Sequence, residues 1–343
     1  MLVISVLHHA KRIGAIGLFF LVCLSATAQH DKPIGPNLET IAYPFPVHYL
    51  SLNIQGEPLK MAYMDAQPQT PNGETVLLLH GKNFNGAYWE QTAKDLNRMG
   101  YRVVIPDQIG FGKSSKPQRI QYTFQLLALN TKRVLDSLGI KSVHVLGHSM
   151  GGMLATRFAL MYPDYTQTLI LENPIGLEDW KKVVPYQTVE DWYNAELAQT
   201  YEKIKQYQLT FYYDNKWKPE YDRWVHMLAG WTNDIDYPRI AWNSALLYDM
   251  IFTQPVVYEF GNITAPTLLI IGQRDRTALG KAKAPKNVQE TLGDYPALGK
   301  KTAAAIPDAE LVELNGIGHL PHIEAYELFI QPLTEFLHAH MAR

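Results

Sequence analysis

Short apolar runs alternate along the chain with segments that have helical spacing. The runs lie at residues 75–79, 101–105, 142–146, 168–171 and 267–271. They are rich in Val, Ile and Leu and lack strict alternation of apolar and polar positions, which is typical of parallel strands buried on both faces. Between them, helical spacing recurs. This alternation predicts an α/β fold with a mostly parallel sheet and helices on both of its faces.

The helical segments are expected at residues 86–99, 122–138 and 150–162. Ahead of the first apolar run, residues 48–64 predict two strands around the turn Gln55-Gly56-Glu57-Pro58. Catalytic groups on parallel sheets sit at the carboxyl ends of the strands. The loops that follow the predicted strands are therefore the places to look for chemistry.

A long aromatic insertion interrupts the pattern between two of the predicted strands. Residues 175–260 contain 6 of the 7 tryptophans, 10 of the 20 tyrosines and three phenylalanines, and helices are expected at 188–206 and 218–229. We interpret this segment as a helical cap inserted into a core formed by residues 47–174 and 261–343. Aromatic residues at helical spacing most often pack in a core. Those aromatic residues of the segment that do not pack in the core would line an apolar substrate pocket.

The first residues have the anatomy of a secretory signal peptide. A basic pair, Lys11-Arg12, precedes an apolar run at 13–24 and the small residues Ser25-Ala26-Thr27-Ala28. A run of about 12 apolar residues is shorter than the roughly 20 that a membrane helix needs. We therefore expect cleavage after Ala28, export to the periplasm or the medium, and no stable membrane anchor. Residues 29–46 are Pro-rich and polar and are interpreted as a lead-in.

The single cysteine and the charge balance exclude several classes of protein. Cys23 lies inside the predicted signal peptide and is preceded by Val22, which fits a lipoprotein cleavage site poorly. A cleaved chain would hold no thiol, and so no disulfide, thiolate metal site or cysteine nucleophile. Lys plus Arg number 31 against 33 Asp plus Glu, a net charge of -2. This balance gives no reason to expect a nucleic-acid partner, and no His and acid cluster predicts a metal.

The strongest chemical motif is Gly147-His148-Ser149-Met150-Gly151-Gly152, between a predicted strand and a predicted helix. This is the G-x-S-x-G nucleophile turn in the strand–turn–helix context that it requires. Gly147 and Gly151 are needed because side chains there would clash in so tight a turn. Ser149 is thereby predicted to be a nucleophile at a helix N-terminus that favours negative charge.

A serine nucleophile needs a base, and the base needs an orienting acid. On this kind of fold the chain order is Ser, then Asp or Glu, then His. Asp275 follows the predicted strand at 267–271, and His319 follows another at 311–314. We predict that His319 is the general base and that Asp275 holds its tautomer. The weaker alternatives are Glu172 as the acid and His322 or His148 as the base.

An oxyanion hole needs two backbone N–H donors. Met150, directly after the nucleophile, is expected to supply one. Lys82 is expected to supply the other, because His80-Gly81-Lys82 follows the strand at 75–79. The sequence leaves open whether the Lys82 side chain does more than face solvent.

Taken together, these motifs resemble the α/β-hydrolase superfamily, in particular its capped, serine-dependent, esterase-like members. The residues that carry the resemblance are His80-Gly81, the run Asp107-Gln108-Ile109-Gly110-Phe111-Gly112-Lys113-Ser114, the turn at 147–152, Asp275 and Gly318-His319. The resemblance implies an eight-stranded sheet, a Ser149–His319–Asp275 triad, no cofactor and hydrolysis through an acyl-enzyme. The sequence departs from the family in Lys82 and in a Lys-, Ala-, Gly- and Pro-rich insertion at 280–305.

The leading functional hypothesis is an exported serine hydrolase whose partner is a small-molecule, ester-like substrate with an apolar or aromatic part. The same site would also suit a C–C bond hydrolase, a lactonase, an amidase or peptidase, or a cofactor-free perhydrolase, because the scaffold does not fix the substrate. A non-catalytic receptor that binds a ligand on this fold is an alternative of another class. The insertion at 280–305 is interpreted as a surface loop or as a flap over the site. Oligomeric state is left open.

Overall fold

Eight strands form one sheet in the computed structural model, which describes residues 34–341. The predicted signal peptide lies outside the described residues. The strands are β1 (Val47–Ile54), β2 (Glu57–Ala66), β3 (Thr75–Leu79), β4 (Arg102–Pro106), β5 (Val143–His148), β6 (Thr166–Glu172), β7 (Thr267–Gly272) and β8 (Ala309–Leu314). Their order across the sheet is β1-β2-β4-β3-β5-β6-β7-β8.

The sheet is mostly parallel, as predicted. Only the pairs β1–β2 and β2–β4 are antiparallel, and every other neighbouring pair runs in the same direction. The two expected strands around residues 55–58 are β1 and β2, joined at Gln55 and Gly56. Both residues of this turn have positive φ, 52° and 88°, as a two-residue hairpin connection requires. The predicted eight-stranded fold class is thus confirmed.

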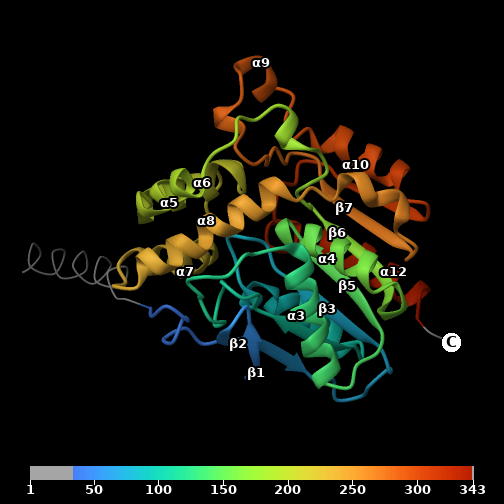
Figure 1. Cartoon of the computed structure of the whole chain (residues 1–343). Helices are drawn as coiled ribbons and strands as arrows, with labels where there is room; N and C mark the ends of the chain where they lie inside the picture. Colours follow the sequence, from blue (N-terminus) through green and yellow to red (C-terminus); the bar gives the residue numbers. More distant parts are fainter. Residues whose placement is uncertain (1–33, 342–343) are drawn as a thin grey trace, which may run out of the picture.

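Helices cover both faces of the sheet. They are α2 (Glu90–Arg98), α3 (Phe124–Ser137), α4 (Met150–Met161), α5 (Val189–Leu197), α6 (Tyr201–Phe211), α7 (Asp222–Thr232), α8 (Tyr237–Thr253), α9 (Lys286–Gln289), α10 (Tyr295–Ala305), α11 (Pro321–Glu324) and α12 (Tyr326–Ala339). Figure 1 shows α3 and α4 side by side over one face and α12 on the other.

Alternate residues of one strand enter two different cores, which explains the continuous apolar runs. In β3, Leu77 and Leu79 pack in the core that contains α3, α4 and α10. Val76 and Leu78 pack in the core that contains α2 and α12. Because successive strand side chains point to opposite faces, a strand covered on both sides has no position that favours a polar residue.

The segment between β6 and β7 forms α5, α6, α7 and α8, which Figure 1 shows grouped at one side of the sheet. The expected single helix over residues 188–206 is wrong, because α5 ends at Leu197 and α6 begins at Tyr201. Thr200 accounts for the break: its extended backbone and its hydroxyl, which accepts from Lys203 N–H at 3.3 Å, start a new helix. Helix α8 was not predicted at all.

Residues 280–305 are neither a surface loop nor a flap throughout. Their second half is α10, which packs on β7 and β8. Tyr295 at its start is buried, and its hydroxyl donates to the Pro174 carbonyl at 3.1 Å. The described part of the lead-in packs against the helices between β6 and β7. Ile34 and Leu38 are buried against Trp231 of α7 and Ile240 of α8.

Phe158→Ala tests the packing of α4 against the sheet. Phe158 is completely buried, so we expect urea unfolding to show a loss of about 3–5 kcal/mol in the free energy of unfolding. Leu328→Ala is the matched control, because Leu328 is 52% exposed on α12 and should cost less than about 1 kcal/mol. Equal losses in the two variants would contradict this packing.

Candidate functional site

Ser149 occupies a tight turn between β5 and α4. Its backbone has φ 57° and ψ -122°, a conformation that costs a non-glycine residue free energy and persists only where its surroundings hold it. The flanking glycines have no room for side chains. A Cβ on Gly147 would lie 2.1 Å from the Gly151 carbonyl oxygen, and a Cβ on Gly151 would lie 2.1 Å from that of Leu79. This packing presents Ser149 at the carboxyl edge of the sheet.

Two of the predicted residues lie next to Ser149 in a single line of hydrogen bonds. His319 Nε2 lies 3.0 Å from Ser149 Oγ, and His319 Nδ1 lies 2.6 Å from Asp275 Oδ2. Because an ionised carboxylate can only accept, Nδ1 carries the proton and Nε2 is left to accept from the serine hydroxyl. Asp275 follows β7 and His319 follows β8, and all three residues are buried.

Asp275 is held as an ionised acceptor. Thr277 N–H donates to its Oδ1 at 2.8 Å, and Asn173 Nδ2 donates to its Oδ2 at 2.9 Å. Burial by itself would raise the pKa of Asp275, but His319 and the hydrogen bonds from Thr277 outweigh burial and lower the pKa below its ordinary value. Asp275 therefore keeps its charge beside His319 at neutral pH.

Asn173 is a residue of this site that the sequence analysis missed. It directly follows β6, is fully buried and has a φ of 35°. Its Oδ1 accepts from Gly272 N–H at 2.8 Å, which turns its NH₂ group toward Asp275. The available signal was its position, because a polar residue just past a buried parallel strand lies on the same edge as Ser149.

Glu172, His322 and His148, the alternative acid and bases, lie close to Ser149, Asp275 and His319 but make other contacts. Glu172 Oε1 accepts from His322 N–H at 2.9 Å and lies 2.8 Å from His322 Nδ1. His148 Nε2 donates to the His319 carbonyl at 2.7 Å, and its Nδ1 lies 3.0 Å from the Tyr88 hydroxyl. Glu172 is thus bonded to His322 rather than to His319. Burial raises the pKa of Glu172 to about 7.

Backbone orientation at the expected oxyanion hole is set by His80. Gln108 N–H donates to His80 Nε2 at 3.1 Å, so the proton is on Nδ1, which donates to the Gly81 carbonyl at 2.9 Å. In a planar trans peptide the next N–H, that of Lys82, points away from the Gly81 carbonyl. Met150 begins α4, where N–H groups have no partner within the helix. The assignment of these two amides as oxyanion donors stays a prediction.

The Lys82 side chain does not face solvent, which answers the question that the sequence left open. It is 10% exposed and points into the helices between β6 and β7. Its Nζ donates to Ser244 Oγ at 2.7 Å, lies 3.4 Å from the centre of the Tyr248 ring and lies 3.9 Å from Glu196 Oε1. Burial lowers the pKa of Lys82 to about 8, although Glu196 acts to raise it.

The loop that carries His319 is fixed from two sides. Arg274, next to Asp275, forms an ion pair with Glu324, and Glu324 Oε2 accepts from Gly318 N–H at 2.8 Å. Tyr212, which follows α6, stacks on the His319 ring with the ring centres 5.2 Å apart and the planes tilted by 21°. The imidazole is therefore confined between its hydrogen-bond partners and an aromatic face.

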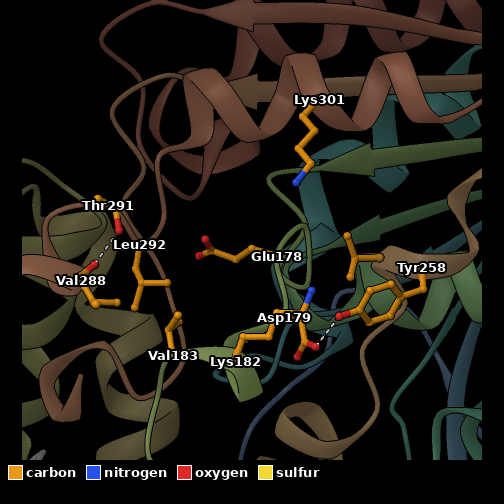
Figure 2. A pocket seen from close by; sticks show the side chains of 10 residues that line it. Glu178, Asp179, Lys182, Val183, Tyr258, Val288, Thr291, Leu292 and Lys301 are labelled. Atoms are coloured by element: carbon orange, nitrogen blue, oxygen red, sulfur yellow. Dashed lines mark hydrogen bonds between the residues drawn. The ribbon is translucent and has the colours of Figure 1, made fainter. Parts of the chain in front are cut away.

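A surface cavity of about 340 Å³ lies elsewhere, between the 280–305 segment and the chain that follows β6. Figure 2 shows Lys301 of α10 pointing toward it from above and the Tyr258 hydroxyl bonded to Asp179 at its edge. It is lined by Glu178, Asp179, Lys182, Val183, Val257, Tyr258, Val288, Thr291, Leu292 and Lys301. None of the predicted site residues lines this cavity, and its charged groups carry both signs.

Within residues 34–341, no group of three or more His, Cys, Asp or Glu side chains is arranged to hold a metal ion. In the same part of the chain, no helix has the length and apolar character to cross a membrane.

Comparison with known proteins gives consistent matches. A family model for the alpha/beta hydrolase fold matches residues 74–326. A probable hydrolytic enzyme from Pseudomonas aeruginosa PAO1, known from a crystal structure, is 52% identical to this chain in sequence. The two structures match with a TM-score of 0.89, and the match covers 90% of this chain and 99% of that enzyme.

Two further relatives are more distant. Lipase 3 from Moraxella sp. (strain TA144) is 29% identical over 334 residues, which cover 92% of this chain and 94% of the lipase. A 2-hydroxy-6-oxo-6-phenylhexa-2,4-dienoate hydrolase from Burkholderia cepacia is 29% identical over 272 residues, which cover 77% of this chain and 88% of that protein.

Glu172→Gln tests the buried carboxyl group behind the site. The pKa of Glu172 is about 7 in the fold, against an ordinary value of 4.5, so the folded protein keeps a proton that the unfolded chain loses between these two values. The stability that Glu172 contributes therefore falls as the pH rises through this window. We expect urea unfolding to show that Glu172→Gln gains about 1–3 kcal/mol relative to the wild type between pH 5 and pH 8.

Glu335→Gln is the control, because Glu335 lies on the exposed side of α12. A difference between Glu172→Gln and the wild type that does not change with pH would show that Glu172 is not protonated in the fold.

Proposed function

Because the chain belongs to the α/β-hydrolase family, we propose that it is a serine hydrolase that cleaves carboxylic esters of apolar or aromatic small molecules. The observation that carries the proposal is the position of His319, whose two ring nitrogens lie 3.0 Å from Ser149 Oγ and 2.6 Å from Asp275 Oδ2. A serine hydroxyl is a weak nucleophile until such a base takes its proton. The match to a lipase over 92% of the chain supports an ester as the substrate.

In the proposed reaction, Ser149 Oγ attacks the ester carbonyl carbon while His319 Nε2 takes the hydroxyl proton. The negative carbonyl oxygen of the tetrahedral intermediate accepts hydrogen bonds from the N–H groups of Met150 and Lys82. His319 then gives its proton to the departing alcohol oxygen, which leaves an acyl group on Ser149. Water, deprotonated by His319, releases the acid in a second cycle, and Asp275 stabilises the imidazolium in both.

Aromatic side chains above the site support an apolar or aromatic substrate. Phe84 follows the oxyanion loop and lies 6.0 Å from Tyr212 and 6.4 Å from Trp224, measured between ring centres. Tyr212 in turn stacks on His319. A substrate held against these rings would bury apolar area next to the reacting carbonyl.

A second candidate is hydrolysis of a C–C bond at the same site. The match to the dienoate hydrolase from Burkholderia cepacia supports it. A panel that includes a vinylogous diketone beside aryl esters separates the two, because only a C–C hydrolase turns over the diketone.

Ser149→Ala tests the nucleophile. We expect kcat/KM for short-chain aryl esters to fall at least about 10,000-fold, since the remaining groups can only bind and polarise the ester. A fluorophosphonate should label the wild type on Ser149 and leave the variant unlabelled. Ser51→Ala, on the exposed face of β1, should retain both activity and labelling. Turnover that persists in Ser149→Ala would refute the triad, and an unlabelled, inactive wild type would favour the receptor alternative.

We also propose that the protein is exported, with residues 1–28 removed. Lys11-Arg12, the apolar run after them and the small residues ending at Ala28 support this proposal. Mass spectrometry of the protein from its native host should find an N-terminus at Gln29. An intact N-terminus, or a lipid on Cys23, would contradict it.

A further inference from the structure

Lys82 belongs to the oxyanion loop through its main chain and to the helices above the site through its side chain. The loop lies against the nucleophile, since a Cβ on Gly81 would be 3.0 Å from Ser149 Cβ. From there the Lys82 side chain reaches Ser244 and Tyr248 of α8 and Glu196 of α5. A positive charge is thus placed one lysine side chain away from the proposed reacting carbonyl.

This ammonium is incompletely paired. It has three N–H donors, and within residues 34–341 Ser244 Oγ is its only hydrogen-bond acceptor. The Tyr248 ring face takes a second direction. Glu196 Oε1, at 3.9 Å, is near enough for attraction but too far for a hydrogen bond. A buried charge is costly unless it is both paired and hydrogen-bonded, so a closer anion would stabilise it further.

The two sides of the ion pair are held very differently. Ser244 and Tyr248 lie on α8, where Leu247 and Met250 are buried in the same core as the sheet. Glu196 lies near the end of α5, a helix with no buried residue, and its side chain is 19% exposed. The ammonium is therefore fixed, whereas Glu196 would lose its contact with the Tyr248 hydroxyl but no core packing on turning into solvent.

We propose that Lys82 is a specificity residue whose ammonium binds a carboxylate carried by the substrate, and that Glu196 occupies the place of that carboxylate in the free enzyme. The proposal rests on the proposed ester hydrolysis and narrows its substrate to esters that join an apolar part to an anionic group. A substrate carboxylate displaces Glu196 and makes the direct hydrogen bond to Nζ that Glu196 does not make.

The test compares charged and neutral esters of matched length. Phenyl hydrogen glutarate carries a carboxylate on its acyl side, 4-carboxyphenyl pentanoate carries one on its leaving group, and phenyl pentanoate carries none. The measured quantity is the ratio of kcat/KM for a charged ester to that for the neutral ester within one variant. A general loss of activity cancels in this ratio, and an effect with either charged ester supports the proposal.

Substitutions of Lys82 and of Glu196 should change the charged-to-neutral ratio of kcat/KM in opposite directions. Lys82→Met should lower it about tenfold or more, because the charged ester loses its counterion. Glu196→Gln should raise it about threefold or more, mainly through a lower KM, because the competing carboxylate is gone. Lys216→Met is the matched control. Lys216 lies between β6 and β7, as Glu196 does, and its side chain is 81% exposed. The ratio for this variant should equal that of the wild type.

If the ion pair only ties the loop after β3 to α5, both variants change kcat/KM for all three esters by the same factor. The ratios then stay constant, and the proposal is overturned. Binding to Ser149→Ala, measured by calorimetry, gives a test that needs no turnover. Tighter binding of the charged esters, lost in the Ser149→Ala, Lys82→Met double variant, supports the proposal, and equal binding of all three overturns it. A wild type that binds the charged esters but cleaves none of the three contradicts ester hydrolysis alone.

Discussion

The site depends on a close backbone approach between the first turn of α4 and the end of β3. Gly151 sits so near the Leu79 carbonyl oxygen that a Cβ would lie 2.1 Å from it. This contact brings the His80–Lys82 loop to Ser149 and helps to hold the serine at φ 57° and ψ -122°. Met150 directly follows Ser149, the proposed nucleophile, whereas Lys82, the other proposed oxyanion donor, follows a different strand. The distance between Ser149 and Lys82 therefore depends on this approach.

The rest of the site is built outward from that contact along one edge of the sheet. β6 contributes Asn173, β7 contributes Asp275 and β8 contributes His319, and each follows directly or closely on the end of its strand. Hydrogen bonds between these loops fix the orientation of the side chains. Asn173, for example, is hydrogen-bonded to both Gly272 and Asp275. These groups are thus already oriented in the folded protein, so that no further loss of conformational entropy is needed during the reaction.

Sequence reasoning located what depends on local pattern and chain order. Ser149 and Asp275 could be placed because each follows an apolar run that had to be a buried strand. His319 could be placed because it follows the predicted strand at 311–314 and comes last in the chain order, and because strand ends meet on one edge. The direction of the Lys82 side chain could not be predicted, since it depends on Ser244 and Tyr248, far away in sequence. The break at Thr200 escaped because helical spacing continues through it, while capping is decided by a single side chain. Asn173 was missed because its role exists only when Gly272 and Asp275 are beside it.

In the proposed reaction, Ser149 Oγ forms a bond to the acyl carbon while two backbone amides hold the oxyanion. A crystal structure with phenylboronic acid, which forms a tetrahedral adduct with a nucleophilic hydroxyl, tests this directly. We expect a bond from boron to Ser149 Oγ, with one boronate oxygen within hydrogen-bond distance of the N–H groups of Met150 and Lys82 and another near His319 Nε2. A boronate bound elsewhere, or at Ser149 with its oxygens away from both amides, would contradict this mechanism.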